Sequence, residues 1–219
     1  MKILKSVLFV ILILFIQSCS TAPKTVTNDS NINNYIMPKA CINKSYVYHC
    51  TQNGKHISNL HSKYSIAGEI INYYTQKELL DKQIVEQNEQ LKIVNDHFYH
   101  INNIETVKSD GSEDYSIEYL KETDNEYHKK LIDKDSTIEN IYGFIKSVRI
   151  EPYSYNDRII NCLIIEIDET HHIKTGNRQP VSNKYHLIYI YGYQIGLIKT
   201  VISNENNILR EIALERIED

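Results

Sequence analysis

The residues best suited to chemistry in this sequence form one short run, Asp168-Glu169-Thr170-His171-His172. Carboxylates and imidazoles bind metal ions and transfer protons. A metal centre would need further ligands, and His97 and His100 are candidates because their spacing places them on one face of a predicted helix. The chain has no HExxH or CxxC spacing, however. We therefore expect a solvated loop with surface histidines, and no metal or cofactor.

A cysteine nucleophile with a histidine base is the second chemistry to consider, through Cys162 and either His171 or His172. Cys162 lies inside the apolar run Ile159–Ile165, where a buried cysteine behaves as a small hydrophobe. The sequence also has no Gly-rich phosphate loop and no GxSxG motif. We expect a non-enzymatic protein. The alternative is a periplasmic hydrolase with an unrecognised site near His171 and His172.

The first nineteen residues have the features of an export signal. Lys2 and Lys5 precede an apolar run, Val7–Ile16, and Gln17-Ser18-Cys19 follows. The run is about half as long as a membrane-spanning helix, which needs about 20 residues. A cysteine directly after a small residue makes this leader resemble the bacterial lipoprotein signal, with Ile16-Gln17-Ser18-Cys19 in the place of the lipobox.

This resemblance implies that residues 1–18 are removed and that Cys19 becomes the first residue, carrying palmitate-type acyl chains on its sulfur and its amine. Each buried CH₂ group contributes about 0.8 kcal/mol, so several chains anchor a protein stably. An aspartate after the lipidated cysteine is the usual retention signal of the inner membrane, and Ser20 stands there instead. The resemblance thus favours the periplasmic face of the outer membrane within the cell envelope.

The remaining chain divides into a tether and a folded part. Residues 19–38 are rich in Ser, Thr and Asn with two prolines, which is typical of a flexible tether. Residues 39–219 are long enough for one globular periplasmic domain with its own core. Removal of the two leader lysines changes the formal charge from −4 to −6, so nucleic acid is not an expected partner. We expect a protein partner in the envelope, including an immunity or inhibitor role.

The positions of the cysteines suggest how the folded part begins. Alternating residues around Asn53-Gly54 predict a β-hairpin over residues 45–58. In an oxidising compartment free thiols are unexpected, so we predict a disulfide between Cys41 and Cys50. Cys162 would then remain buried and reduced. A bond from Cys162 to either of the other two is the main alternative.

Helices are predicted next in the chain. One amphipathic helix is predicted in the stretch that starts at Ser62. A second is predicted further along the chain, where residues of one face recur at spacings of three and four. The positions that define the second face are Leu80, Ile84, Gln87, Leu91, Val94, Phe98 and Ile101. Two short strands, Ile104–Lys108 and Tyr115–Leu120, are expected around a Ser-Asp-Gly-Ser turn.

The last third of the sequence is strand-like. A capping-box pattern at Ser136 favours a short helix over 137–147, and a strand over Tyr142–Ile150 is the alternative. Four successive strands are then expected at Arg158–Asp168, Lys184–Tyr191, Ile195–Ser203 and Ile208–Ile217. The expected fold class is therefore α+β, namely a C-terminal antiparallel β-meander with two amphipathic helices packed on one face, preceded by a disulfide-linked β-hairpin.

Overall fold

The structure is a computed structural model that describes residues 33–36, 38, 41–67, 70–79, 84–94, 97–100, 104–109, 112–122, 125–133, 137–205 and 207–218. Its elements are α2 (Asn33–Ile36), β1 (Ser45–Gln52), β2 (Lys55–Ala67), β3 (Ile70–Leu79), β4 (Ile84–Val94), β5 (His97–His100), β6 (Ile104–Ser109), β7 (Ser112–Glu122), β8 (Glu126–Asp133), β9 (Thr137–Tyr155), β10 (Arg158–Thr175), β11 (Val181–Gly192), β12 (Gly196–Asn204) and β13 (Asn207–Glu218).

The strands form one antiparallel 13-stranded sheet in the order β3-β2-β1-β13-β12-β11-β10-β9-β8-β7-β6-β4-β5, and β3 also pairs with β4. From β6 to β13 the order in space follows the order in sequence. β1 lies beside β13, with Ser45 opposite Glu218 and Gln52 opposite Arg210. The pairing of β3 with β4 brings the two ends of the strand order together, so the sheet curls around its own inner face.

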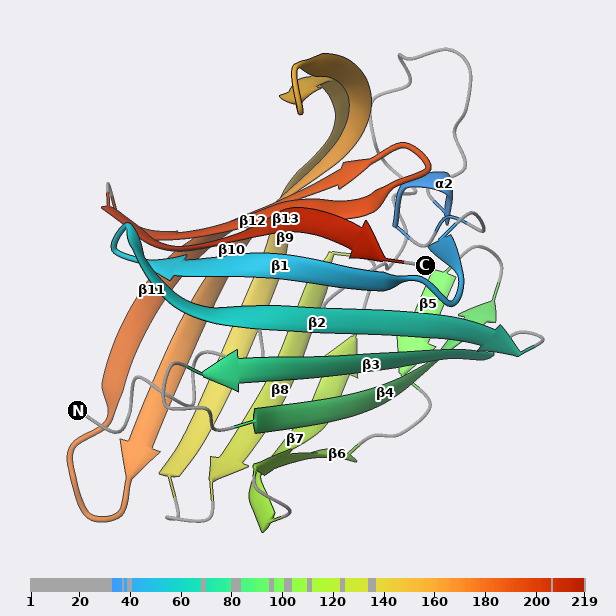
Figure 1. The fold of residues 1–219 in the computed structure, drawn as a ribbon. Coiled ribbons are helices and arrows are strands. Elements are labelled where there is room, and N and C mark those ends of the chain that lie inside the picture. Colours follow the sequence, from blue (N-terminus) through green and yellow to red (C-terminus); the bar gives the residue numbers. More distant parts are fainter. Residues whose placement is uncertain are drawn as a thin grey trace.

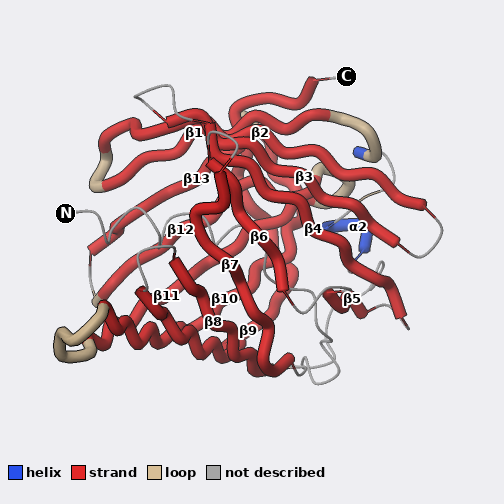
Figure 2. Tube along the Cα trace, turned by 90° about the horizontal axis from the view of Figure 1, so that it is seen from below, coloured by secondary structure: helices blue, strands red, loops and turns tan. Residues whose placement is uncertain are grey.

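The inner face of the curled sheet holds the core. Figure 1 shows β1, β2 and β3 stacked across the front of the molecule, with β8 to β11 passing behind them at a steep angle. Side chains from both groups of strands belong to one hydrophobic cluster, which includes Tyr48, Leu60, Ile141, Leu163 and Leu187. Seen from below in Figure 2, nearly all of the described chain is strand. A twisted sheet that folds back on itself buries one face without helices.

Two-residue turns set the register of two hairpins. Asn53 and Gly54 have φ values of 48° and 74°, which is the left-handed pair that a two-residue hairpin turn needs. The predicted hairpin over 45–58 is confirmed as β1 and β2. Asn156 and Asp157, at 48° and 59°, form an equivalent turn between β9 and β10. The four strands predicted for the last third are also present, as β10 to β13.

The predicted α+β class is wrong, because the stretch with the two expected helices forms strands β2 to β5. The reason lies in the inner face of β2 and β3. Ser58, Ser62, Thr75 and Lys77 are buried there, in alternation with exposed or half-buried residues. Polar residues at inward positions conceal the two-residue period that marks a strand. The short strands predicted around the Ser-Asp-Gly-Ser turn are confirmed as β6 and β7.

The helix expected over 137–147 is also wrong, and the strand alternative for this region is correct. Residues 137–155 form β9, a strand of 19 residues that pairs with β10 along its length and with β8 over residues 138–144. The first part of β9 alternates between buried and exposed side chains: Glu139, Ile141 and Gly143 are buried, whereas Tyr142 and Phe144 are exposed. Pairing on both sides outweighs the local capping signal.

The predicted disulfide-linked hairpin is wrong as well, because Cys41, Cys50 and Cys162 are free buried thiols. Cys41 precedes β1, and its Sγ lies 3.4 Å from the carbonyl oxygen of Gln194 in the turn between β11 and β12. Cys50 lies near the other end of β1, opposite Ser58. A strand rises about 3.3 Å per residue, so this end of β1 is about 17 Å from its start, whereas a disulfide requires Cα atoms within about 7 Å.

Part of the expected tether packs onto the sheet. Asn33–Ile36 form the short helix α2, where Tyr35 is buried and its ring meets that of Tyr193 edge to face at 5.4 Å. The backbone N–H of Gln194 donates to the carbonyl of Asn34 at 2.8 Å. Within the described ranges, no helix has the length and the apolar character needed to cross a bilayer.

Candidate functional site

The run of acids and histidines at 168–172 lies within strand β10, and not in a loop as expected. Successive side chains of a strand point to opposite faces. Glu169 and His171 therefore join the inner face, where they are 1% and 0% exposed, whereas Asp168 and His172 are exposed on the outer face. The strand thus places His171 and His172 on opposite faces, although their positions in the sequence suggested that they belong to one site.

His171 lies between two carboxylates inside the curled sheet. Its Nδ1 is 2.6 Å from Oε1 of Glu139 on β9, and its Nε2 is 2.7 Å from Oε2 of Glu169. Both carboxylates are buried. Because a carboxylate accepts at each ring nitrogen, each nitrogen carries a proton and the ring is an imidazolium. The edge of the His171 ring also meets the ring of Tyr185 at 4.6 Å.

Tyr127 and Lys129 of β8 complete this cluster. The Tyr127 hydroxyl donates a hydrogen bond to Oε1 of Glu169, and Lys129 Nζ lies 3.8 Å from the same oxygen. To reach β10 from β8, Tyr127 must pass over β9. Gly143 of β9 is paired with both Tyr127 and Glu169. A Cβ atom at Gly143 would overlap the Tyr127 ring, so the ring can lie there only because the glycine has no side chain.

The charges of the cluster balance. Burial by itself raises the pKa of Glu169, but the charge of Lys129 and the contacts with His171 and Tyr127 outweigh it and lower this pKa to about 2. Burial opposes protonation of His171, yet hydrogen bonds to Glu139 and Glu169 raise its pKa. Two carboxylates thus face one imidazolium and one ammonium. We call Tyr127, Lys129, Glu139, Glu169 and His171 the inner ionic cluster.

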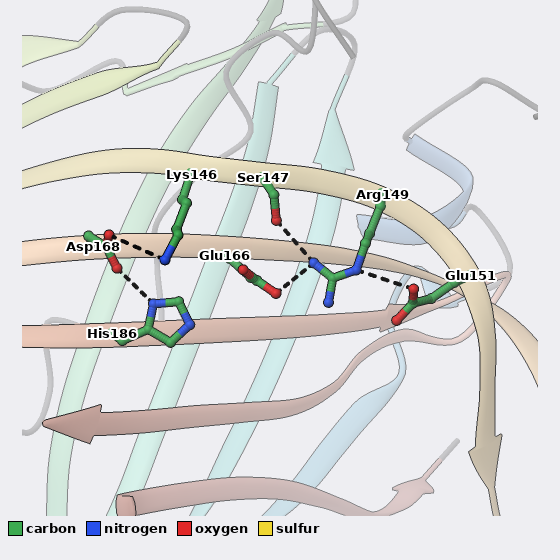
Figure 3. A network of polar contacts seen from close by, with 7 residues as sticks. All are labelled: Lys146, Ser147, Arg149, Glu151, Glu166, Asp168 and His186. Atoms are coloured by element: carbon green, nitrogen blue, oxygen red, sulfur yellow. Dashed lines mark hydrogen bonds and ion pairs between the residues drawn. The ribbon is translucent and has the colours of Figure 1, made fainter. Parts of the chain in front are cut away.

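The outer face of β9, β10 and β11 carries a separate ladder of charges (Figure 3). Asp168 accepts from His186 Nδ1 at 2.7 Å and faces Lys146 Nζ at 3.9 Å. Arg149 Nη1 donates to Glu166 at 2.6 Å, and its Nε donates to the Glu151 carboxylate at 3.2 Å. Cross-strand pairs of this kind stabilise a sheet, and exposed pairs contribute little each.

The other predicted residues lie apart from one another. His172 contacts the exposed ring of Tyr142 on the outer face, at 5.6 Å between centroids. Cys162 is buried in a second apolar cluster with Ile164, Ile190 and Ile198, where burial raises its pKa to about 11. Cys162 therefore does not meet His171. In the portion of the chain with described side chains, no group of three or more His, Cys, Asp or Glu residues is placed to hold a metal ion.

Some predicted sites fall outside the described residues. Cys19, the predicted lipidation site, is one of them, and so are the side chains of His97 and His100. Conversely, sequence reasoning missed two cations of the inner face, Lys77 of β3 and Arg210 of β13, which are 4% and 7% exposed. A signal for Arg210 was present, because it stands two residues before Ile212 in an alternating strand.

No protein-family model and no curated protein matches the chain. Two solved structures are similar to it. A protein classed as a lipoprotein from Parabacteroides distasonis has a TM-score of 0.55 at 12% identity, over 81% of this chain and 95% of that one. A protein classed as exported, with a YmcC-like fold, from Bacteroides fragilis has a TM-score of 0.43 at 11% identity, over 81% and 96% of the two chains. The first likeness shows a shared fold, and an envelope protein is consistent with it.

Proposed function

We propose that the chain is a non-enzymatic binding protein of the bacterial cell envelope, held on the periplasmic face of the outer membrane by lipid on Cys19. The leader supports the anchor: Lys2, Lys5, the apolar run Val7–Ile16 and Cys19 have the order and lengths of a lipoprotein signal. The fold supports the location, because the chain shares it with a protein classed as a lipoprotein.

The non-enzymatic part of the proposal rests on one observation, which is that both ring nitrogens of His171 are hydrogen-bonded to carboxylates. A general base needs a nitrogen that can accept a proton, and both nitrogens of this ring already donate to buried carboxylates. Glu169 is held as a carboxylate by Lys129 and His171, so it is a poor proton donor. These groups neutralise one another inside the core, which is the arrangement of a structural ion cluster.

The hydrolase alternative places an unrecognised site near His171 and His172, and a site that used both side chains would need them on one face of the strand. They lie on opposite faces of β10, where His171 contacts Glu139 and His172 contacts Tyr142. A binding protein needs no such pair. The expected partner is a protein of the envelope. The proposal includes capture of a toxin or a hydrolase, as by an immunity protein or an inhibitor.

The anchor is tested by intact-mass analysis of protein extracted from membranes and by fractionation on a density gradient. Wild-type protein should begin at Cys19, carry acyl chains and sediment with the outer membrane. The Cys19→Ala variant should lose the acyl mass and leave the membrane fraction. A mature chain that begins elsewhere would contradict the lipoprotein assignment, and sedimentation with the inner membrane would contradict the outer-membrane location.

The non-enzymatic role is tested by replacing the ionic side chains with apolar ones of similar volume. The variant Lys129→Met, Glu139→Leu, Glu169→Met and His171→Phe removes all four charges together, a change that often preserves stability. Circular dichroism and the unfolding midpoint establish that it folds. It should restore the envelope phenotype of a deletion strain as well as wild type does, with His172→Phe as the outer-face control. A folded variant that fails to restore it would favour catalysis.

A further inference from the structure

One edge of strand β9 extends beyond its neighbour in the sheet. β9 pairs with β10 along its whole length, whereas β8 pairs with it only as far as Phe144. The last backbone hydrogen bond on the β8 side runs from the N–H of Ile145 to the carbonyl of Asn125. Among the strands that the structure describes, none pairs with residues 146–154 on the side away from β10. We call these residues the free edge, and Figure 1 shows the tip of this hairpin curling beyond the neighbouring strands.

The backbone groups of the free edge point toward the open side at every second residue. The turn between β9 and β10 has two residues, so Tyr155 and Arg158 beside it form a hydrogen-bonded pair. In an antiparallel ladder, such pairs alternate with pairs whose N–H and C=O groups point away from the partner strand. The residues whose groups therefore face the open side are Val148, Ile150, Pro152 and Ser154. Pro152 fits this assignment, because a strand accepts proline where the missing N–H faces an open edge. Such a row of backbone groups is a template for a further strand.

The free edge matches a second copy of itself in length and in backbone pattern. Two copies related by a two-fold axis place their edge strands antiparallel. Ile150 is the midpoint of residues 146–154, and its backbone groups face the open side. With the axis at Ile150, residue 146 of one copy lies opposite residue 154 of the other, so the pairing spans the whole free edge. Ile150 then forms a hydrogen-bonded pair with Ile150 of the second copy.

The charges of the outer face favour this register. Arg149 and Glu151 flank the axis, so the arginine of each copy lies opposite the glutamate of the other. Figure 3 shows both side chains on the outer face of β9, where they are 39% and 45% exposed and thus accessible to a partner strand. Moving the axis by one residue would instead place Arg149 against Arg149 or Glu151 against Glu151. Opposite charges directly across two strands are favourable, and like charges are unfavourable.

We propose that two copies of the protein pair through the free edges of β9, so that one sheet continues across the two-fold axis. The two Ile150 residues exchange two backbone hydrogen bonds, and Val148 of each copy donates one more to the carbonyl of Pro152 in the other. On the inner face, Val148 and Ile150 are half-buried against the core, and the second strand covers apolar surface that they leave exposed. This inference goes beyond the proposed binding function and does not depend on it.

Disulfide cross-linking of the full chain in intact cells tests the pairing. Ile150→Cys places two thiols opposite each other across the axis, with Cα atoms about 5.5 Å apart. Mild oxidation should therefore give a covalent dimer on electrophoresis, and reductant should remove it. Ser154→Cys is the matched control, because the two copies of residue 154 lie eight positions apart along the paired strands, about 26 Å. The native cysteines with described side chains are buried.

Three outcomes of this experiment would overturn the proposal. The first is no dimer from Ile150→Cys in a protein whose circular dichroism matches wild type. The second is an equal yield of dimer from Ser154→Cys, which would show random collision. The third is a cross-link from Ile150→Cys to a protein of different mass, which would assign the free edge to another partner.

Charge changes in the Ile150→Cys background test the register. Glu151→Arg and Arg149→Glu each place like charges opposite each other, and each should reduce the cross-linked fraction by about fivefold or more. When the two variants are produced together with tags of different size, cross-linking should recover between them, because the arginines of one copy then face the glutamates of the other. Lys146→Glu, which changes a charge opposite Ser154, should leave the fraction unchanged. Cross-linking that ignores both charge changes, or that does not recover in the mixed pair, would overturn the register.

Discussion

The phenol ring of Tyr127 lies over the backbone of Gly143, in the space where any other residue would carry its Cβ atom. This relationship allows a side chain of β8 to cross β9 and donate a hydrogen bond to Glu169 of β10. Three strands are thereby joined through one buried contact. The φ of Gly143 lies outside the left-handed region, so the backbone conformation does not require a glycine there. The glycine is needed because the Tyr127 ring approaches the backbone so closely.

The first prediction concerns this contact. Gly143→Ala should lower the free energy of unfolding by about 1–3 kcal/mol, because the added methyl group displaces the Tyr127 ring. Urea denaturation measures the change. If the clash is the cause, Tyr127→Leu combined with Gly143→Ala should be less destabilised than the sum of the single variants. Simple additivity would contradict the proposed contact.

The second prediction compares two neighbouring histidines. His171→Gln should destabilise the fold by about 3–5 kcal/mol, because it leaves Lys129 as the one cation of the inner ionic cluster for two buried carboxylates. His172→Gln is the matched control on the same strand. Its side chain is exposed, and the change should stay within about 0.5 kcal/mol. Thermal and urea unfolding of both variants test the difference. Comparable effects of the two substitutions would mean that the inner ionic cluster does not form.

The third prediction is a pH dependence of stability. Glu169 has a pKa of about 2 in the fold against an ordinary value of 4.5, so its contribution is complete above pH 4.5 and is lost as the pH falls toward 2. The shift corresponds to roughly 3 kcal/mol at most. His171 has a raised pKa, so its contribution is complete below its ordinary value of 6.5 and is lost as the pH rises through the raised value. The cluster is therefore most stabilising between pH 4.5 and 6.5.

Urea denaturation of wild type and Glu169→Gln from pH 2 to pH 7 measures the acid side of this dependence. The difference in unfolding free energy should shrink as the pH falls below 4.5, because Glu169 of the unfolded chain then takes up a proton, whereas Glu169 in the fold does so only near pH 2. A difference that stays constant over the whole range would show that Glu169 is not held as a carboxylate by its neighbours.

The fourth prediction concerns the thiols. Cys41, Cys50 and Cys162 should all react with a thiol reagent in the denatured protein and react slowly in the native protein, because all three are buried. Reductant should not change the unfolding midpoint. Peptide mapping without reduction provides the check, and a linked peptide that contains Cys41 and Cys50 would contradict the structure.

The sequence predicts the hairpin around Asn53-Gly54 and the four last strands well, because turn residues and apolar alternation agree there. It fails over β2 and β3, where Ser62, Thr75 and Lys77 occupy inward positions and the apolar residues no longer alternate. Such polar residues are buried only because other strands cover them. That covering is a property of the curled sheet as a whole, and a local window does not contain it.

The inner ionic cluster was partly predictable. Leu163, Ile165 and Ile167 alternate along β10, and Ile173 continues the same period after Glu169 and His171. A strand extended by this rule places both polar residues inward. Their partners Tyr127 on β8 and Glu139 on β9 lie 42 and 32 positions earlier in the chain, and no spacing motif connects them.

The pairing of β1 with β13 also governs the order in which the protein is completed. About 160 residues separate Gln52 from its partner Arg210, so β1 cannot complete its pairing until β13 is available. A chain that crosses a membrane from its N-terminus, as proposed, delivers β1 early and β13 at the end of translocation. Until then β1 and β12 expose unpaired edges that invite other strands. The final twelve-residue strand, β13, pairs with both β1 and β12, so its arrival closes both of these edges at once.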